Sequence, residues 1–298
     1  LSVLALWQTQ GLGMARATGY TNTIQWGNLA LMLACLAVVP LVVFWRVYGK
    51  PWRVLMVVAI ALALAASLLS QSRGGWVALV GVLVLWVVVV SRIRPRLLAP
   101  LLAWAAGLLV VLALVLGLTP RFKDRIDLAA TEVSGYVEAG KENTSVGLRL
   151  AQYDLVAQLI PQKPWLGWGA HGYVAELQRR VDAGEYVKEM LHYPQIHNDF
   201  LDVWVKVGVL GVLLQATLFG WVLAMFWPTR ARMGGYAEDS PPWRDALALR
   251  VMGCVVPVAY LVFGMSQPFF NHNSGIMCFV FYVAVLWSAL QGVERSQR

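Results

Sequence analysis

The chain has 298 residues, of which 59% are hydrophobic and only 13% are charged. Soluble domains contain about 25% charged residues, so this composition excludes an ordinary soluble protein and indicates a polytopic membrane protein. The net charge is +8, and we expect its basic residues to mark one side of a membrane, with no nucleic-acid partner.

Apolar stretches that could cross a bilayer, which takes about 20 residues per helix, recur along the chain. Only helices and closed barrels satisfy the backbone in lipid, and barrels show short alternating segments, so we expect an all-α, polytopic transmembrane helix bundle. The chain starts with Leu1 inside an apolar run, so we expect further spans before it. The seven predicted spans are residues 25–46, 53–70, 75–91, 97–118, 203–227, 247–265 and 273–291.

The spans predict three parts of the chain: transmembrane helices in 1–118, a loop with amphipathic helices in 119–202, and C-terminal transmembrane helices in 203–298.

The cysteines all fall within predicted spans and lack the spacing of metal ligands. We therefore expect neither a disulfide nor a zinc site from Cys35, Cys254 and Cys278.

Basic residues concentrate in alternate connections between the predicted spans. One side of the membrane then holds twelve of them, whereas the short connections of the other side hold only Arg73. Basic residues favour the cytoplasmic side, so the loop 119–202 is predicted to be external. The twelve, to which we assign a topological role only, are Arg46, Lys50, Arg53, Arg92, Arg94, Arg96, Arg230, Arg232, Arg244, Arg250, Arg295 and Arg298.

The external connections contain the polar residues that are candidates for a functional site. Residues 8–28 form a glycine-rich polar lead into the first full span and contain Arg16. The connection 70–75 is too short for a flexible loop, so Arg73 is expected at the membrane surface or in the bundle.

Within the long loop, apolar residues of 148–160 recur near 3.6 spacing and predict an amphipathic helix that opens with Arg149. Residues 164–173 are rich in Trp, Gly and turn signals, typical of a membrane interface, and lack the lysine and spacing of a phosphate loop. A second amphipathic helix is predicted for 174–190, which gives the bundle an external cap of surface helices.

A further helix is predicted to start at Asn198 or Asp199, because Pro194 resists helix and both residues are good N-caps. His197 then lies at a helix N-terminus, where the dipole favours a neutral ring and an anion such as phosphate. A structural explanation stays open, since acidic residues suit any first turn and Asp202 can pair with Lys206 at i,i+4.

The last external turn, residues 266–273, contains His272, whose neighbours are also explained by ordinary turn chemistry. Three external arginines near lipid suit a diphosphate, because the guanidinium fork matches phosphate oxygens. A polyprenyl diphosphate would supply both the anion and the lipid. No external Asp-x-Asp pair is present, so we expect no metal and no other cofactor.

Three groups of residues resemble motifs of the O-antigen ligase family of bacterial inner membranes. His197-Asn198, nine residues, then Gly208-Val-Leu-Gly211 resembles its His-Asn and Gly-x-x-Gly signature. Ser72-Arg73-Gly74 resembles its Ser-Arg-Gly element, and Gly147-Leu-Arg149 with the segment 164–169 resembles its external-loop elements, in the family's order. The segment from Arg16 to Asn22 fits loosely, because Thr-Asn-Thr stands where the family often has Asn-Pro-Asn.

The resemblance implies a glycosyltransferase C-like fold and a transferase that moves a polysaccharide from undecaprenyl diphosphate to lipid A-core oligosaccharide. The protein would be multi-pass in the bacterial cell inner membrane, with its active site facing the periplasm. We expect His197 to act as general base and Arg73 and Arg149 to stabilise the leaving diphosphate. Residues predicted to bind substrate are Arg16, Asn198, Tyr153 and His272.

Other functions stay open on the sequence. An O-antigen polymerase or a protein O-oligosaccharyltransferase would use the same lipid-linked donor and differ only in the acceptor. An anion transporter could also place arginines in a bundle, but it would show broken or polar helices near the midplane and repeat symmetry. The predicted spans are instead nearly uncharged at their centres.

Overall fold

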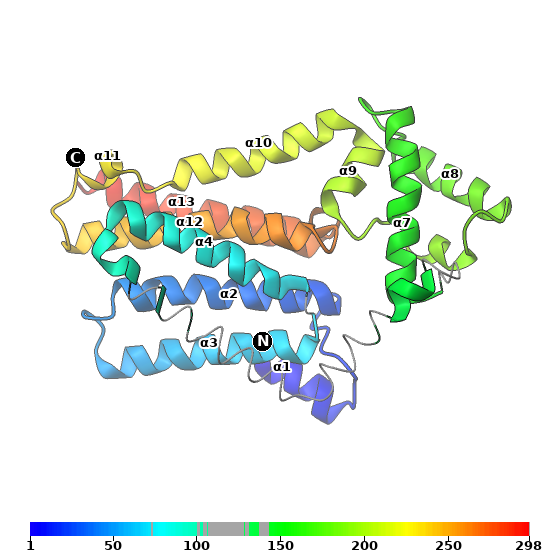
Figure 1. Cartoon of the computed structure of the whole chain (residues 1–298). Coiled ribbons are helices and arrows are strands. Elements are labelled where there is room, and N and C mark those ends of the chain that lie inside the picture. The colour runs from blue at the N-terminus through cyan, green and yellow to red at the C-terminus, as the bar shows by residue number, and fades with distance from the viewer. Residues whose placement is uncertain are drawn as a thin grey trace. The chain divides into compact units, whose positions relative to one another are not determined.

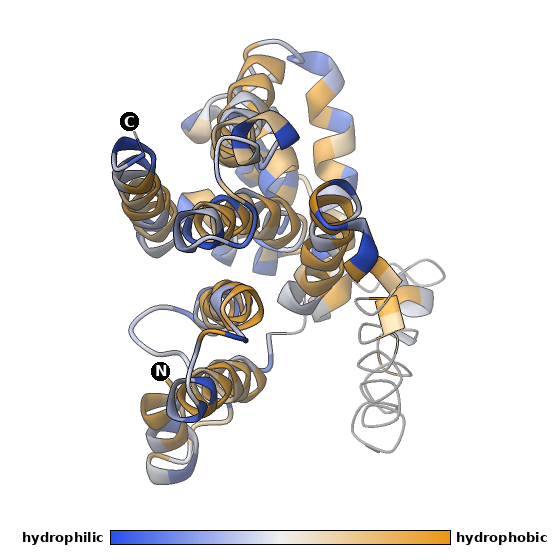
Figure 2. Cartoon of the chain, turned by 90° about the vertical axis from the view of Figure 1, so that its left-hand side faces the viewer, coloured by the Kyte–Doolittle hydropathy of each residue, from blue (hydrophilic) through white to orange (hydrophobic). Residues whose placement is uncertain are grey.

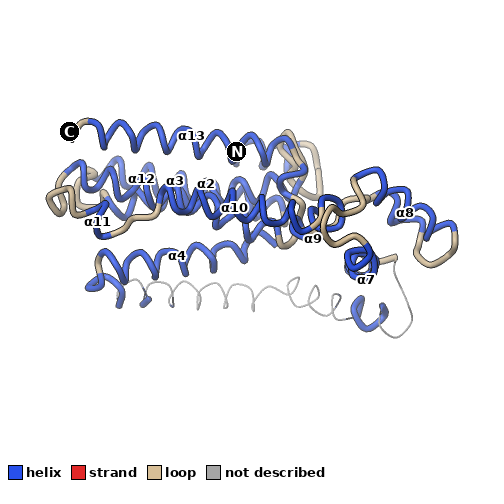
Figure 3. The backbone as a smooth tube through the Cα atoms, turned by 90° about the horizontal axis from the view of Figure 1, so that it is seen from above, coloured by secondary structure: helices blue, strands red, loops and turns tan. Residues whose placement is uncertain are grey.

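The computed structural model describes residues 1–72, 74–99, 102–103, 106, 128, 131–136 and 143–297. Every regular element in these ranges is a helix, which confirms the all-α prediction (Figure 3). The chain divides into two compact units, the first made of Leu1–Ala99 and Thr217–Arg298 and the second of Pro100–Ala216. Most of the predicted span 97–118 and position 73 lie outside the described residues.

Six helices of the described chain are long and apolar enough to cross a membrane, and they confirm five of the other predicted spans and the part of 203–227 that begins at Val209. Figure 2 shows the hydrophobic residues along them. The protein is therefore a multi-pass membrane protein. The helices are α2 (Thr23–Val43), α3 (Lys50–Ser70), α4 (Val77–Ile93), α10 (Val209–Phe226), α12 (Pro241–Gly264) and α13 (Asn273–Arg295). The short elements beside them are α1 (Ser2–Leu6), η1 (Trp7–Gly11), η2 (Gly74–Trp76), η3 (Pro95–Leu97), α11 (Arg230–Met233) and η6 (Phe269–Asn271).

Helices α12 and α2 form the interior of the first unit. Their most apolar windows are 67% and 61% buried, against 17–22% for the other spans. Helix α12 packs against α13, α4 and α2, and α2 also packs along α3 (Figure 1). Because the remaining faces are apolar and exposed, they suit contact with lipid tails.

At one end of the first unit the polar connections gather. Arg16 Nε donates to the carbonyl of Ser70 at 2.9 Å, which ties the polar lead of the chain to the end of α3. The hydroxyl of Ser72 donates to Asn28 Oδ1 at 3.1 Å. Thr21 Oγ1 lies 3.2 Å from Ser274 Oγ, so the start of α13 belongs to the same end.

The basic connections lie at the opposite end of that unit. Arg230 Nε donates to the carbonyl of Arg92 at 2.9 Å, and Arg94 pairs with Glu238 at 3.4 Å. Arg250 forms an ion pair with Glu294, which joins the start of α12 to the end of α13. The polar and the basic connections are thus separated by the length of the spans, as the charge pattern predicts.

The second unit contains α7 (Ser145–Leu159), α8 (Ala170–Asp182) and α9 (Asp199–Val207), with the 3-10 turns η4 (Ile160–Gln162) and η5 (Lys188–His192). Apolar faces of these elements share a core, with Leu155, Tyr173 and Val205 fully buried in it. The expected amphipathic helices are therefore present. The second of them ends at Asp182 and does not reach residue 190, because Gly184 has a φ of 76° and turns the chain.

One predicted span is wrong in its continuity. Residues 203–227 form two helices, α9 and α10, which are separated at Gly208. The φ of Gly208 is 82°, a backbone conformation that other residues rarely adopt. The α9 segment is consequently a separate short helix that carries Asn198 and His197 at its N-terminal end.

Candidate active site

Helix α7 presents three candidate site residues on one face. Its N-cap is Thr144, whose hydroxyl oxygen accepts from the Gly147 amide at 2.9 Å. Residues three and four positions apart are neighbours on a helix surface, so Arg149, Gln152 and Tyr153 project together. This face meets the segment 193–198, which leads into α9.

Two side chains of α7 hold that segment in place. Gln152 Nε2 donates to the carbonyl oxygens of Tyr193 and Gln195, at 2.8 and 3.2 Å. The Tyr153 hydroxyl donates to the carbonyl oxygen of His197 at 3.1 Å. Burial raises the pKa of Tyr153, so it remains a protonated donor at neutral pH.

The residues on either side of His197 are anchored as well. Asn198 Oδ1 accepts from the amides of Phe200 and Leu201, both at 3.1 Å, which confirms Asn198 as the N-cap of α9. The Ile196 amide donates to Asp202 Oδ1 at 2.9 Å. Hydrogen bonds made by Ile196, by Asn198 and by Tyr153 of α7 thereby fix the backbone around His197. The imidazole consequently projects from a fixed position.

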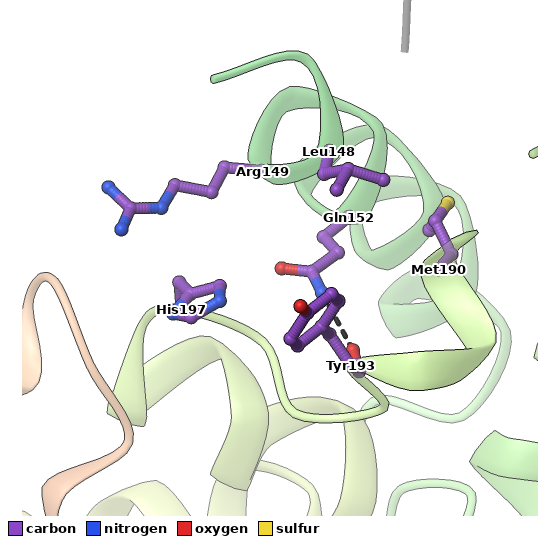
Figure 4. A pocket seen from close by; sticks show the side chains of 6 residues that line it. All are labelled: Leu148, Arg149, Gln152, Met190, Tyr193 and His197. Atoms are coloured by element: carbon purple, nitrogen blue, oxygen red, sulfur yellow. Dashed lines mark hydrogen bonds between the residues drawn. The ribbon is translucent and has the colours of Figure 1, made fainter. Parts of the chain in front are cut away.

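His197 and Arg149 line one pocket of about 250 Å³, within the second unit. Figure 4 shows the Arg149 guanidinium, the His197 imidazole and the amide oxygen of Gln152 extending toward the same open side. The other lining residues are Leu148, Met190 and Tyr193.

The end of α9 is fixed by the loop 164–169. The amides of Trp168 and Gly169 donate to the carbonyls of Val205 and Lys206, both at 2.8 Å. In return, the Val209 amide donates to the carbonyl of Pro164 at 2.8 Å. The loop therefore supplies the hydrogen bonds that the helix loses where it breaks.

Glycine is required on both sides of this contact. A Cβ at Gly208 would lie 2.1 Å from the carbonyl oxygen of Trp165, and one at Gly167 would lie 2.5 Å from the carbonyl carbon of Lys206. The close neighbour of Gly208 is thus the loop 164–169, whereas small residues of this spacing commonly allow another helix to approach. Gly167 accordingly serves the packing of the loop against α9, whereas nothing lies within 4 Å of a Cβ added at Gly169.

The two buried carboxylates of α9 are engaged within the protein. Asp202 forms the predicted i,i+4 pair with Lys206 at 2.5 Å, and the Lys206 ammonium lies 5.4 Å from the centre of the Tyr173 ring. Asp199 Oδ2 accepts from Gln215 Nε2 at 2.9 Å. Both side chains are buried within the second unit, and Asp202 is paired there with Lys206.

Two of the predicted substrate-binding residues, Arg16 and His272, belong to the first unit. Arg16 meets Ser70 as described above, and His272 Nε2 lies 3.1 Å from Gln267 Nε2. Burial lowers the pKa of His272, so its ring favours the neutral form. Arg73 lies outside the described residues. Its neighbour Ser72 is buried against Asn28, at the polar end of that unit.

The predicted residues in the second unit occupy two kinds of position. Arg149 and His197 line the pocket, whereas Tyr153 and Asn198 lie outside its lining and position the His197 backbone. Gln152 was missed by sequence reasoning. The signal that could have found it is its position three residues after Arg149 on an amphipathic helix, which places it on the same face.

The pocket combines a fixed positive charge with a proton acceptor. A guanidinium binds phosphate oxygens with two parallel hydrogen bonds and stays charged at all physiological pH values. A neutral imidazole can remove a proton from a hydroxyl group. Among the residues that the structure describes, no three His, Cys, Asp or Glu side chains are grouped as metal ligands.

Comparison with known proteins gives two matches. A family model described as O-antigen ligase matches residues 58–216, more than half of the chain, and this range contains the pocket and the break at Gly208. An uncharacterized protein of Haemophilus influenzae is 27% identical over 288 residues, which cover 93% of this chain and 69% of that protein.

Proposed function

Because the chain belongs to the O-antigen ligase family, we propose that it is a membrane glycosyltransferase that uses a polyprenyl-diphosphate-linked donor. The specific proposal is an O-antigen ligase, which transfers a polysaccharide from undecaprenyl diphosphate to lipid A-core oligosaccharide. The placement of Arg149 and His197 on one pocket carries this proposal, because transfer from a diphosphate needs an anion-binding group and a base together.

In the proposed reaction, His197 removes the proton from a hydroxyl group of the acceptor sugar. The hydroxyl oxygen attacks the anomeric carbon of the donor sugar, and a new glycosidic bond forms with inversion. The bond between the anomeric carbon and the diphosphate oxygen breaks, and its electron pair leaves with the diphosphate. General-base catalysis contributes typically 10²–10⁴-fold to such a step.

Arg149 has the role of stabilising the departing diphosphate. Removing one well-placed donor to a developing negative charge costs about 10²–10³-fold in rate, so its effect is comparable with that of the base. We assign the same role to Arg73 from its Ser-Arg-Gly element, and we keep Arg16 and His272 as substrate-binding residues. No step of the proposed reaction uses a metal ion.

We propose that the active site faces the periplasm of a bacterial inner membrane. The support is the separation of charges in the first unit, where the basic connections lie at one end and the polar connections at the other. Cytoplasmic loops are enriched in Lys and Arg, so the polar end is assigned to the periplasm. A lipid-linked donor is accessible to a site on that side.

The proposal is tested with purified full-length chain and undecaprenyl-diphosphate-linked polysaccharide. The acceptor is offered separately as lipid A-core, as a glycan chain or as a pilin-like protein. Transfer to lipid A-core alone supports a ligase, whereas transfer to the glycan or to the protein identifies a polymerase or a protein O-oligosaccharyltransferase. An absence of transfer to all three acceptors, with donor binding intact, would overturn the proposed activity.

A further inference from the structure

Gln152 has one end of its side chain engaged and the other end unpaired. The residue is only 2% exposed. Its Nε2 donates to the carbonyls of Tyr193 and Gln195. Its Oε1 is buried and has no hydrogen-bond partner within the described part of the chain. Buried polar atoms are nearly always hydrogen-bonded, so this oxygen requires an explanation.

The orientation of this amide follows from its surroundings. Carbonyl oxygens are acceptors only, so the group that faces Tyr193 and Gln195 has to be the NH₂ group. A flipped amide would place its oxygen against two carbonyl oxygens and lose both hydrogen bonds. Gln152 Oε1 therefore faces away from the segment 193–198 as a pure acceptor.

That acceptor faces the pocket. Gln152 lines it together with Arg149 and His197. In Figure 4 the amide oxygen points toward the side on which the Arg149 guanidinium and the His197 imidazole lie. The pocket thus contains a positively charged hydrogen-bond donor, Arg149, and a neutral hydrogen-bond acceptor, Gln152. The two residues are three positions apart on the same face of α7.

These two groups select different parts of a ligand. Diphosphate oxygens are acceptors and carry negative charge, so they pair with Arg149 and are not bound by an amide oxygen. A sugar hydroxyl group can donate a hydrogen bond, so the amide oxygen of Gln152 can bind it. Side chains at i and i+3 have Cβ atoms roughly 5–6 Å apart, so the two ligand groups must be close neighbours.

We infer that Gln152 Oε1 accepts a hydrogen bond from a hydroxyl group of the donor sugar that is linked directly to the diphosphate. This inference rests on the proposed function and adds to it a subsite for the first sugar of the lipid-linked chain. Gln152 then has two roles. Its NH₂ group donates hydrogen bonds to the segment before His197, and its oxygen accepts a hydrogen bond from the sugar. A site built to accept from a hydroxyl rejects analogues that lack it, because its buried oxygen is left unpaired.

The test compares binding of three ligands to the full chain in nanodiscs: undecaprenyl diphosphate, undecaprenyl-diphosphohexose, and derivatives of the latter with one hydroxyl replaced by hydrogen. Gln152→Met keeps the length of the side chain and removes its acceptor together with the two hydrogen bonds to Tyr193 and Gln195. We expect this variant to bind the hexose derivative about 3- to 10-fold more weakly, which corresponds to the loss of one neutral hydrogen bond. Its affinity for the bare diphosphate should stay within about twofold of that of the wild type. Arg149→Ala should weaken both ligands.

A matched control is Gln162→Met. Gln162 is exposed, and its Nε2 likewise donates to a backbone carbonyl, that of Gln158 at 3.0 Å. This variant should bind both ligands as the wild type does. If Gln152→Met weakens both ligands equally, or neither, the glutamine only fastens the segment and the inference is wrong.

The deoxy derivatives give a comparison whose first part needs only the wild type. With the wild type, one derivative should bind about 3- to 10-fold more weakly than its parent, and that loss should disappear in Gln152→Met. If no derivative binds more weakly, the inference is overturned while the proposed function stands. If the wild type binds neither the bare diphosphate nor the hexose derivative, the proposed function is wrong, and so is the inference that rests on it.

Discussion

The carbonyl oxygen of Trp165 lies 2.1 Å from the position that a Cβ would occupy on Gly208. The two residues are far apart in the sequence, and the segments around them are joined by backbone hydrogen bonds. The loop donates to the last carbonyls of α9 and accepts from the first amide of α10. This contact fixes the C-terminal end of the helix whose N-terminal end carries His197.

Gly208→Ala should destabilise the second unit, since the φ of 82° and the contact with Trp165 both exclude a methyl group. We expect a loss of about 1–3 kcal/mol or more, measured as the free energy of unfolding in detergent. The control is Gly220→Ala within α10, where nothing lies within 4 Å of an added Cβ. Equal stability of the two variants would contradict the close approach.

His197→Ala should slow transfer about 10²–10⁴-fold and leave donor affinity nearly unchanged, because a neutral imidazole contributes little to holding a diphosphate. The measurement is donor binding together with the single-turnover rate. A loss of donor affinity in this variant as large as in Arg149→Ala would make His197 a phosphate-binding residue.

Arg149→Ala should lower both donor affinity and turnover, because the guanidinium meets the diphosphate in the ground state and in the transition state. Arg149→Lys should restore only part of the affinity, since an ammonium keeps the charge and lacks the bidentate fork. Binding titrations of the three proteins decide this. Full rescue by lysine would show that charge alone matters at this position.

Arg149→Cys, made in a variant without the native cysteines, should react with a membrane-impermeant thiol reagent in intact spheroplasts. Arg94→Cys should react only after lysis, because basic connections face the cytoplasm. Labelling in the reverse pattern would invert the orientation and remove the periplasmic site from the proposal.

Transfer should continue after incubation with excess EDTA, because the proposed chemistry uses only Arg and His side chains. Activity is measured before chelation, after it, and after addition of Mg²⁺ or Mn²⁺. Activity that is lost with EDTA and restored by a metal would instead point to His192, His197, Asp199 or Asp202 as ligands.

Acid should weaken the second unit through Glu176. Hydrogen bonds from Arg179 and Arg180 lower the pKa of Glu176 from 4.5 to about 2. The folded state therefore favours the carboxylate, and this stabilisation is full above pH 4.5 and is lost as the pH falls toward 2. Unfolding experiments across this range should show a smaller loss of stability for Glu176→Gln than for the wild type.

The sequence by itself determined the class of the protein and the approximate positions of most of its helices. Apolar length and the lack of charge in the spans follow from the cost of polar groups in lipid, a local property of each stretch. Asn198 as N-cap and the pair of Asp202 with Lys206 were also predictable, because caps and i,i+4 pairs depend on residues within one turn. The motifs around His197 and Arg149 were recognisable for the same reason.

Only the tertiary structure decided which of those residues meet. The break at Gly208 interrupts a continuous apolar run, and it is stabilised by a loop some forty residues earlier, which no local pattern reveals. The unpaired oxygen of Gln152 likewise exists because its NH₂ group is taken by the carbonyls of Tyr193 and Gln195. Both features arise from hydrogen bonds between segments distant in sequence, whose pairing is set by how the helices pack.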